Sequence, residues 1–231
     1  MSMDTLPSIS ILIRLYNGID FLPESLHSVL SQTYKDFEVI IGVNGHGETS
    51  DVYSRALDIV TSKGDPRITV KNYPSVKGGA EALNALVADA KAEWVAILDV
   101  DDTWHREKLE YQVFIRDKVT PQYDVIGTFC KYFGSFNGFP NIPYGHVDPE
   151  IFKITNPMIH SSVLMRKSIV HYTDFCGLDD YDLWCRLVKE GKRFYTIVGV
   201  LTFHRIHDSS FYNSSKNQDP EALRKHYFSL S

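Results

Sequence analysis

The chain has 231 residues, of which 23% are charged and 43% are hydrophobic, and its formal net charge is -5. A chain of this length and composition can bury one sizeable core, which excludes wholesale disorder. The acidic excess argues against a dedicated nucleic-acid binder, because such proteins usually carry a basic surplus.

Short apolar runs alternate with helix-like segments through the first hundred residues. Strands are predicted where apolar residues run together, and helices where they recur every three or four positions. The predicted strands are 9–13, 37–43, 68–72 and 94–98, and the predicted helices are 23–32, 51–60 and 80–90. This alternation predicts βαβ units and a parallel sheet covered on both faces. Ligands of such sheets bind beyond the carboxyl ends of the strands.

The second half of the chain is less regular. Its predicted elements are strands at 125–132, 161–165 and 194–203, a helix at 179–190, and a long loop or loose hairpin at 132–149. The polar segment 209–218 is predicted to be mobile. Asp219-Pro220-Glu221 is typical of a helix start, with Asp as N-cap and Pro at the first helical position. No linker divides the chain, so we expect one domain over 1–231.

Three carboxylates, Asp99, Asp101 and Asp102, directly follow the predicted strand 94–98. They repel one another unless a cation or solvent compensates their charge. Oxygen ligands at this edge of the sheet suit Mg²⁺ or Mn²⁺, and such an ion keeps waters and bridges to substrate phosphates. The alternative is a solvated acidic turn, in which Asp102 or Thr103 caps the helix that contains Lys108.

Seven segments in a fixed order carry a resemblance to a known family. They are Ile9 to Asn17, Ser28 to Ile40, Gly78 to Asn84, Leu98 to Gln112, Asn156 to Arg166, Asp179 to Trp184, and Arg205 to Ser209. Together they resemble the motifs of family 2 inverting glycosyltransferases, including the D-x-D region, the acidic E-D motif and the closing R-x-H-x-x-S. The match covers roughly residues 8–210.

The resemblance implies a GT-A fold, with a mostly parallel central sheet flanked by helices and a smaller mixed sheet on the acceptor side. It implies a nucleotide-sugar-binding half over about 8–102, an acceptor half over about 103–210, and a C-terminal tail or helix over 211–231. The implied activity is inverting transfer of a sugar from a nucleotide-diphosphate donor, with UDP- or dTDP-sugars favoured, to a hydroxyl of a glycan, lipid-linked or protein acceptor. Such an enzyme belongs to polysaccharide biosynthesis.

The resemblance also assigns roles to individual residues. Asp180 stands at the position of the catalytic base, which takes the proton of the acceptor hydroxyl. The implied ligands of Mn²⁺ or Mg²⁺ are Asp101 or Asp102, together with His207. The implied nucleotide-sugar contacts are Leu15, Tyr16, Asn44, Gly78, Asn84, Asp99 and Asp101. His160 and Asp179 are assigned to the acceptor, although a packed core role for His160 is an open alternative.

Several residues depart from the family pattern. Asn44 stands where a carboxylate usually reads the base, which makes the preference for UDP or dTDP less certain. Arg14 and Leu15 stand where Pro-Thr is usual, and a structural ion pair is the plainer role for Arg14. Asp179 replaces the more usual Glu, and His204 stands where Tyr is commoner and receives no role. The alternatives are a degenerate module that binds a nucleotide sugar without turnover, and a sugar nucleotidyltransferase.

The remaining features concern location. Three cysteines without C-x-x-C spacing argue against a disulfide scaffold or a structural zinc site and favour a reducing compartment. The N-terminal residues carry no signal-peptide pattern, and the longest apolar run, 194–203, is shorter than the roughly 20 residues of a membrane span. We therefore expect a cytoplasmic protein with no transmembrane segment, and leave peripheral membrane association open.

Overall fold

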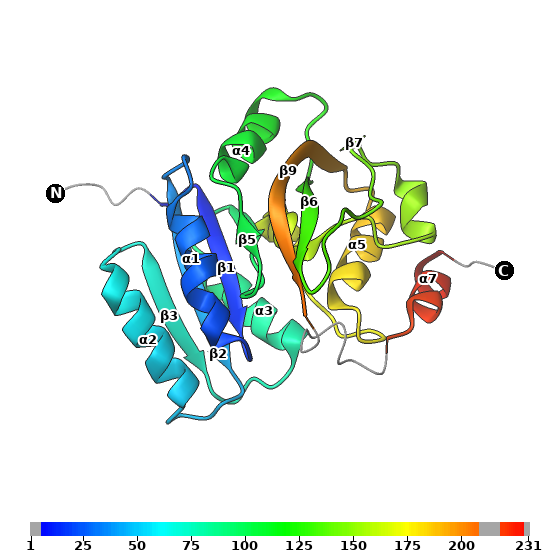
Figure 1. Ribbon diagram of the computed structural model, residues 1–231. Coiled ribbons are helices and arrows are strands. Elements are labelled where there is room, and N and C mark those ends of the chain that lie inside the picture. The colour runs from blue at the N-terminus through cyan, green and yellow to red at the C-terminus, as the bar shows by residue number, and fades with distance from the viewer. Residues whose placement is uncertain (1–5, 208–217, 229–231) are drawn as a thin grey trace.

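The computed structural model describes residues 6–207 and 218–228. Over these residues, nine strands form one sheet in the order β3-β2-β1-β4-β8-β6-β9-β5, with β7 paired to β9 (Figure 1). The strands are β1 Ile9–Leu15, β2 Phe37–Asn44, β3 Ile68–Tyr73, β4 Trp94–Ile97, β5 Thr103–Trp104, β6 Val125–Gly134, β7 Gly145–His146, β8 Leu164–Arg166 and β9 Phe194–Ile206. The helices are α1 Leu22–Leu30, α2 Asp51–Lys63, α3 Gly79–Asp89, α4 Lys108–Lys118, α5 Asp179–Lys189 and α7 Pro220–Phe228. Short 3-10 turns are η1 Ile19–Phe21, η2 Pro149–Lys153, η3 His160–Ser162 and η4 Lys167–Ile169.

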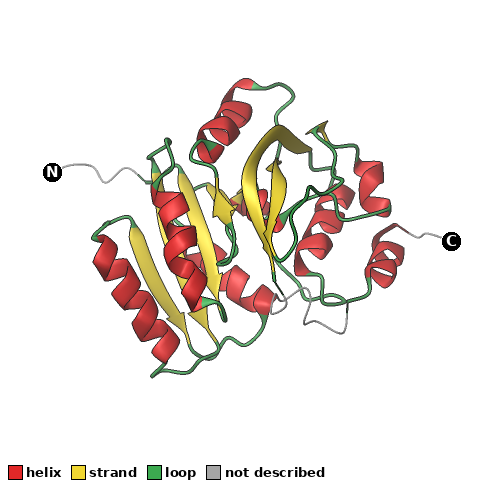
Figure 2. Cartoon of the chain, viewed as in Figure 1, coloured by secondary structure: helices red, strands yellow, loops and turns green. Residues whose placement is uncertain are grey.

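The first four strands form the parallel part of the sheet, as predicted. β1 pairs in parallel with β2 and β4, and β2 pairs in parallel with β3. Because successive side chains of a strand point to opposite faces, β1 contributes to two cores. Ile11 and Ile13 pack with residues of α1 and α2 on one face, whereas Leu12 packs with α3 on the other. Figure 2 shows these helices in front of and behind the strands.

The same sheet continues without interruption into the second half of the chain. β4 pairs antiparallel with β8, and β8 pairs antiparallel with β6. β6 then runs parallel to the long strand β9, against which β5 and β7 pair antiparallel. The carboxyl ends of β1, β2 and β4 therefore face the same edge as the carboxyl ends of β6 and β9.

The predicted strand at 161–165 is wrong at its beginning. Residues 160–162 form the turn η3, and β8 starts only at Leu164. The Ser162 hydroxyl donates to the Ile159 carbonyl at 2.7 Å, which satisfies a turn rather than a ladder. The alternative in which Asp102 or Thr103 caps the helix containing Lys108 is also wrong. Thr103 lies in β5, and Glu107 precedes α4 without a side-chain cap.

The C-terminal helix begins where the sequence predicts. The Ala222 amide donates to Asp219 Oδ1 at 2.9 Å, so Asp219 is the N-cap of α7. Leu223 is fully buried, and the Tyr227 hydroxyl donates to Asp182 Oδ1 of α5 at 2.8 Å. α7 therefore packs against the helix that begins with Asp179 and Asp180. The predicted mobile segment 209–218 lies outside the described residues apart from Gln218.

Two expectations about location can be compared with the fold. None of the described helices is both long and apolar enough to cross a membrane. Cys130, Cys176 and Cys185 are all free thiols, and the first and last are buried. Cys130 and Cys185 therefore contribute to packing, and none of the three forms a disulfide within the part of the chain that the structure describes.

Candidate active site

The three carboxylates after β4 lie at the shared carboxyl edge of the sheet. The chain turns directly after the strand, and the Asp102 amide donates to the Asp99 carbonyl at 3.0 Å. This tight turn sends the Asp99 side chain toward η3, and the side chains of Asp101 and Asp102 toward the end of β9. Each carboxylate therefore has its own set of partners, although all three follow the same strand.

Asp99 is held by the turn η3. His160 Nδ1 lies 3.3 Å from Asp99 Oδ1, and the Ser161 hydroxyl donates to Asp99 Oδ2 at 3.0 Å. Burial alone would raise the pKa of Asp99, but the charges of His160 and Arg14 outweigh burial and hold that pKa below its usual value. Asp99 is therefore an ionised carboxylate at neutral pH, with a fixed orientation.

Asp102 is a structural anchor at the centre of the site. Its side chain is completely buried, and both of its oxygens accept hydrogen bonds at 2.8 Å, from His204 Nδ1 and from the Arg205 amide. The Arg205 guanidinium also donates to the Asp101 carbonyl at 2.9 Å. The end of β9 is thereby bound to the carboxylate turn, and Asp102 presents no open oxygen for an ion.

Asp101 is the more accessible of the two carboxylates that the sequence assigned to a metal. Its side chain is 21% exposed, and its Oδ2 lies 2.8 Å from His207 Nε2. Burial raises the pKa of Asp101, and the neighbouring charges of Asp102 and Asp99 add to that rise. No group of three or more His, Cys, Asp or Glu side chains is arranged to hold a metal within residues 6–207 and 218–228. A carboxylate and an imidazole do converge here, however, and this pair fits an ion that takes its other ligands from water and phosphate.

The acidic pair Asp179 and Asp180 opens helix α5, facing the carboxylates after β4. Asp180 Oδ2 accepts a hydrogen bond from Asn156 Nδ2 at 3.0 Å, and Asp180 Oδ1 accepts from the Tyr181 amide at 2.6 Å. Burial raises the pKa of Asp180 and the charge of Asp179 adds to the rise, whereas His160 and the Asn156 hydrogen bond oppose it. A partly buried carboxylate with a raised pKa, close to other charged side chains, is the arrangement expected of a general base.

Arg14 joins the two sides of the site. Its Nη1 lies 3.8 Å from Asp179 Oδ2, which is the ion pair that the sequence analysis preferred for Arg14. A Cβ at Gly79 would stand 2.1 Å from Arg14 Nη1, so a larger first residue of α3 would push the Arg14 guanidinium aside. Asp179 is thereby engaged from the donor half of the chain, in addition to the acceptor role assigned from the sequence.

The residues predicted to contact the nucleotide are more dispersed. Asn44 is buried at the end of β2; its Nδ2 donates to the Val76 carbonyl at 3.3 Å and its Oδ1 has no protein partner. Tyr16 is half exposed, with its ring centroid 5.0 Å from that of His46. Gly78 precedes α3 as its N-cap residue, in extended backbone. Leu15 lies wholly within the core, so its side chain faces the protein interior.

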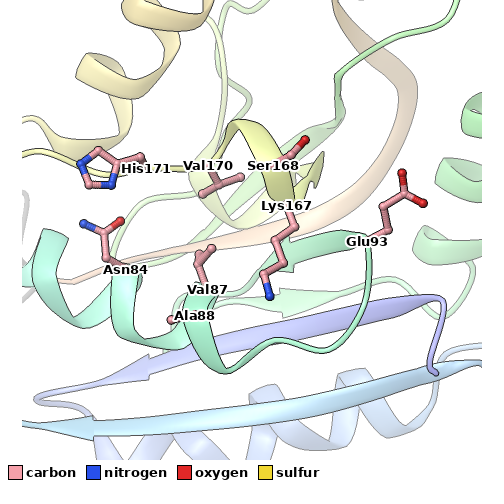
Figure 3. A pocket seen from close by; sticks show the side chains of 8 residues that line it. All are labelled: Asn84, Val87, Ala88, Glu93, Lys167, Ser168, Val170 and His171. Carbon is pink, nitrogen blue, oxygen red and sulfur yellow. The ribbon is translucent and has the colours of Figure 1, made fainter.

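Asn84 has a structural task in α3. Its Nδ2 donates to the Tyr172 carbonyl and its Oδ1 accepts from the Tyr172 amide, each at 2.8 Å. Asn84 also borders a hollow of about 460 Å³ between α3 and η4 (Figure 3). Of the residues predicted for the site, Asn84 alone lines this hollow, and we therefore assign the hollow no part in the chemistry.

The sequence analysis gave no role to four residues that hold the candidate site together: His204, Arg205, Ser161 and Tyr172. Each has a partner far away in the chain: Asp102 lies 102 residues from His204 and 103 from Arg205, Asp99 lies 62 residues from Ser161, and Asn84 lies 88 residues from Tyr172. The Arg205 match to the closing motif was the available signal for the end of β9. No local pattern marks Tyr172.

The family comparison agrees with this geometry. The family described as "Glycosyl transferase family 2" matches residues 10–171. The chain belongs to this family. Among its relatives is the UDP-Glc:alpha-D-GlcNAc-diphosphoundecaprenol beta-1,3-glucosyltransferase WfaP of Escherichia coli, 28% identical over 226 residues that cover 94% of this chain and 83% of WfaP. The O-antigen biosynthesis glycosyltransferase WbnJ of Escherichia coli is 28% identical over 225 residues, covering 93% of this chain and 86% of WbnJ. This family 2 chain is therefore a glycosyltransferase.

Solved structures establish the fold of this family 2 glycosyltransferase as GT-A. S. aureus TarS 1-349 in complex with UDP-GlcNAc superimposes with a TM-score of 0.74 at 17% identity, covering 90% of this chain and 61% of TarS 1-349. The mannosyltransferase PcManGT from Pyrobaculum calidifontis, in complex with GDP-Man and Mn²⁺, gives a TM-score of 0.68 at 17% identity and covers 90% of this chain and 60% of PcManGT. The chain thus spans about three fifths of each of these structures.

Proposed function

We propose that this chain is a metal-dependent, inverting glycosyltransferase that uses a nucleotide-diphosphate sugar, with UDP- or dTDP-sugars favoured. The acceptor is a hydroxyl of a glycan or a lipid-linked saccharide. The observation that carries the proposal is that two acidic groups from different parts of the chain share the same basic neighbours, Arg14 and His160. Asp99 and Asp101 lie at the carboxyl edge of the parallel strands, and Asp180 opens α5 beside them, linked through Arg14 and Asp179.

The relatives support the choice of substrates. WfaP is named for a UDP-glucose donor and a diphosphoundecaprenol-linked acceptor. Asn44 is the residue that we expect to recognise the base of the donor, because it is buried and its Oδ1 lacks a protein partner. An unpaired buried acceptor is costly, and an N–H donor of a bound base would satisfy it. Uracil and thymine carry such a donor at N3.

Asp101 and His207 are the residues that would hold a divalent ion. Asp102 is the less suitable of the two carboxylates, because its side chain is completely buried and both of its oxygens already accept hydrogen bonds. A bound Mg²⁺ or Mn²⁺ would act as a Lewis acid on the diphosphate and offset the charge that it gains on leaving. Asp101 supplies a partly exposed oxygen, and His207 supplies a ring nitrogen 2.8 Å from that oxygen.

Asp180 would act on the acceptor. Its carboxylate removes the proton of the acceptor hydroxyl while that oxygen forms a bond to the anomeric carbon. The bond between the anomeric carbon and the diphosphate oxygen breaks at the same time, and its electron pair leaves with the nucleoside diphosphate. Attack opposite the leaving group inverts the configuration. The hydrogen bonds from Asn156 and the Tyr181 amide fix the carboxylate without neutralising it.

The first experiment is calorimetric titration of UDP, dTDP, GDP and CDP, each in Mn²⁺ and in EDTA. We expect one pyrimidine diphosphate to bind, with affinity that depends on the metal. Asp101→Asn should remove the metal-dependent part, whereas the surface variant Asp117→Asn should not. Failure of all four nucleotides to bind folded protein would refute the proposed donor site. Binding without product, when lipid-linked acceptors are added, would establish the alternative of a binding module.

A further inference from the structure

His160 occupies an unusual position between the two halves of the site. Its ring is mostly buried, with 12% of the side chain exposed. Nδ1 faces Asp99 Oδ1 at 3.3 Å, and Nε2 lies 3.0 Å from the Tyr172 hydroxyl. Both ring nitrogens are therefore engaged by protein groups, which leaves neither of them for an acceptor.

Tyr172, the second partner of His160, is itself fixed on both sides. The Asn84 side chain binds its amide and its carbonyl, each at 2.8 Å, so α3 holds the backbone of Tyr172 in place. The Tyr172 side chain is buried, and its ring meets the His160 ring edge-on at a centroid distance of 5.7 Å. A continuous chain of contacts thus runs from Asn84 through Tyr172 and His160 to Asp99.

The backbone of η3, the turn that carries His160, is also fixed by hydrogen bonds from two other side chains. Trp104 Nε1 donates to the Ser161 carbonyl at 2.7 Å, and Gln112 Nε2 donates to the Ser162 carbonyl at 2.9 Å. Trp104 and Gln112 are both buried. His160 is therefore presented to Asp99 by a turn whose backbone cannot shift without breaking buried hydrogen bonds, each of which is costly to leave unmade.

We propose that His160 is a positioning residue for the donor: it fixes the Asp99 carboxylate at the nucleotide edge by spanning Asp99 and the anchored Tyr172 hydroxyl. This inference rests on the proposed function, because it assumes that Asp99 contacts the donor. It replaces the acceptor role that the sequence suggested for His160. The surrounding charges agree, since Asp99, Asp180 and Asp179 all favour the imidazolium and, against the opposing effect of burial, raise the pKa of His160 to about 9. As an imidazolium, His160 donates from both nitrogens.

A double-mutant cycle tests the proposal, with UDP and Mn²⁺ as the calorimetric probe. His160→Gln and Asp99→Asn should each weaken UDP binding about tenfold, the scale of one charge-assisted hydrogen bond. The double variant should be no weaker than Asp99→Asn alone, because His160 acts only through Asp99. Additive effects would overturn the proposal, since they would mean that His160 acts independently of Asp99.

Tyr172→Phe extends the test without removing a ring. It deletes only the hydroxyl that holds His160 Nε2, and we expect UDP binding to weaken by about threefold. The matched control is Tyr227→Phe, which deletes a hydroxyl bonded to Asp182, a residue with no assigned contact to the donor, and should leave UDP affinity unchanged. Equal effects of both variants on affinity, or an effect of Tyr172→Phe on unfolding alone, would indicate general packing and overturn the proposal.

A second readout separates this inference from the proposed function. NMR titration of the His160 ring should give a pKa near 9 in the wild type. In Asp99→Asn that pKa should fall toward the ordinary value. If the wild type binds no UDP, the proposed donor is refuted, and the ring titration still decides whether His160 is held by Asp99. A wild-type His160 that titrates at the ordinary value overturns the inference whatever the nucleotide result.

Discussion

Replacement of Asp180 by Asn provides a sharp test of the proposed chemistry. The substitution keeps the shape of the side chain but removes the negative charge that accepts the proton. A general base contributes about 10²- to 10⁴-fold to rate, so kcat should fall by that factor. Nucleotide affinity should be unchanged, because Asp180 lies on α5, opposite the residues assigned to the donor.

The same substitution has a structural cost that can be worked out separately. Asp180 Oδ1 accepts from the Tyr181 amide, and an amide oxygen can still do so. In place of Oδ2, however, the substituted side chain would present an NH₂ group to Asn156 Nδ2, which is also a donor. A fully buried donor left unpaired costs about 1–3 kcal/mol; because this pair is partly buried, the free energy of unfolding should fall by about 1 kcal/mol.

The double variant Asn156→Asp, Asp180→Asn distinguishes these two effects. It reverses the pair, so that an amide at position 180 donates to a carboxylate at position 156 and the buried hydrogen bond is restored. We expect denaturant unfolding to recover most of the lost stability, while steady-state transfer stays low because the carboxylate is displaced. Full turnover by Asp180→Asn, or recovery of kcat in the reversed pair, would refute the assignment of Asp180 as the base.

Three further predictions concern the surrounding groups. Burial and the charge of Asp179 raise the pKa of Asp180, and a base acts only when it is ionised. In a pH profile, kcat should therefore fall on the acid side with a midpoint above 3.8, the ordinary pKa of an Asp. A kcat that stays constant down to that pH would contradict this prediction. Asp102→Asn should lower the free energy of unfolding by about 1.5–3 kcal/mol, because the buried hydrogen bond between its carboxylate and the His204 ring loses its charge. The surface variant Asp117→Asn should cost under about 1 kcal/mol in the same thermal or urea melts. Gly79→Ala should abolish most activity, because the new methyl group displaces Arg14 from Asp179. Its stability should stay close to that of the wild type, because alanine suits a helix better than glycine. Normal transfer by this variant would show that the ion pair is dispensable.

The sequence predicted the parallel part of the sheet because its signal is local. Each strand from β1 to β4 is a short apolar run, and the helices between them carry apolar residues at helical spacing. The ends moved by only a few residues, as for β1, which extends to Leu15. Motif resemblance then singled out Asp99, Asp101, His207 and Asp180, which the structure brings to the same edge of the sheet and links through His160 and Arg14.

What the sequence could not predict depends on contacts between distant residues. The segment 161–165 is apolar enough to predict a strand, yet Ser161 turns toward Asp99, which lies 62 residues away in the chain. Asp101 and Asp102 are equivalent by motif, and only their partners at the end of β9 distinguish an open carboxylate from an anchored one. The same holds for His160: Asp99 lies 61 residues away in the chain, and Tyr172 lies 12 residues away, outside the turn η3 that carries His160.

The pairing of β4 with β8 has a consequence for engineering. It joins the two halves that we propose for the donor and the acceptor through backbone hydrogen bonds, with Trp94 opposite Arg166 and Ala96 opposite Leu164. Because one sheet runs through both halves, the distance between the proposed donor site and the proposed base is set by the sheet. A chimera that imports the acceptor half of a relative must preserve this register, because a slip of one residue would turn every side chain of β8 to the wrong face.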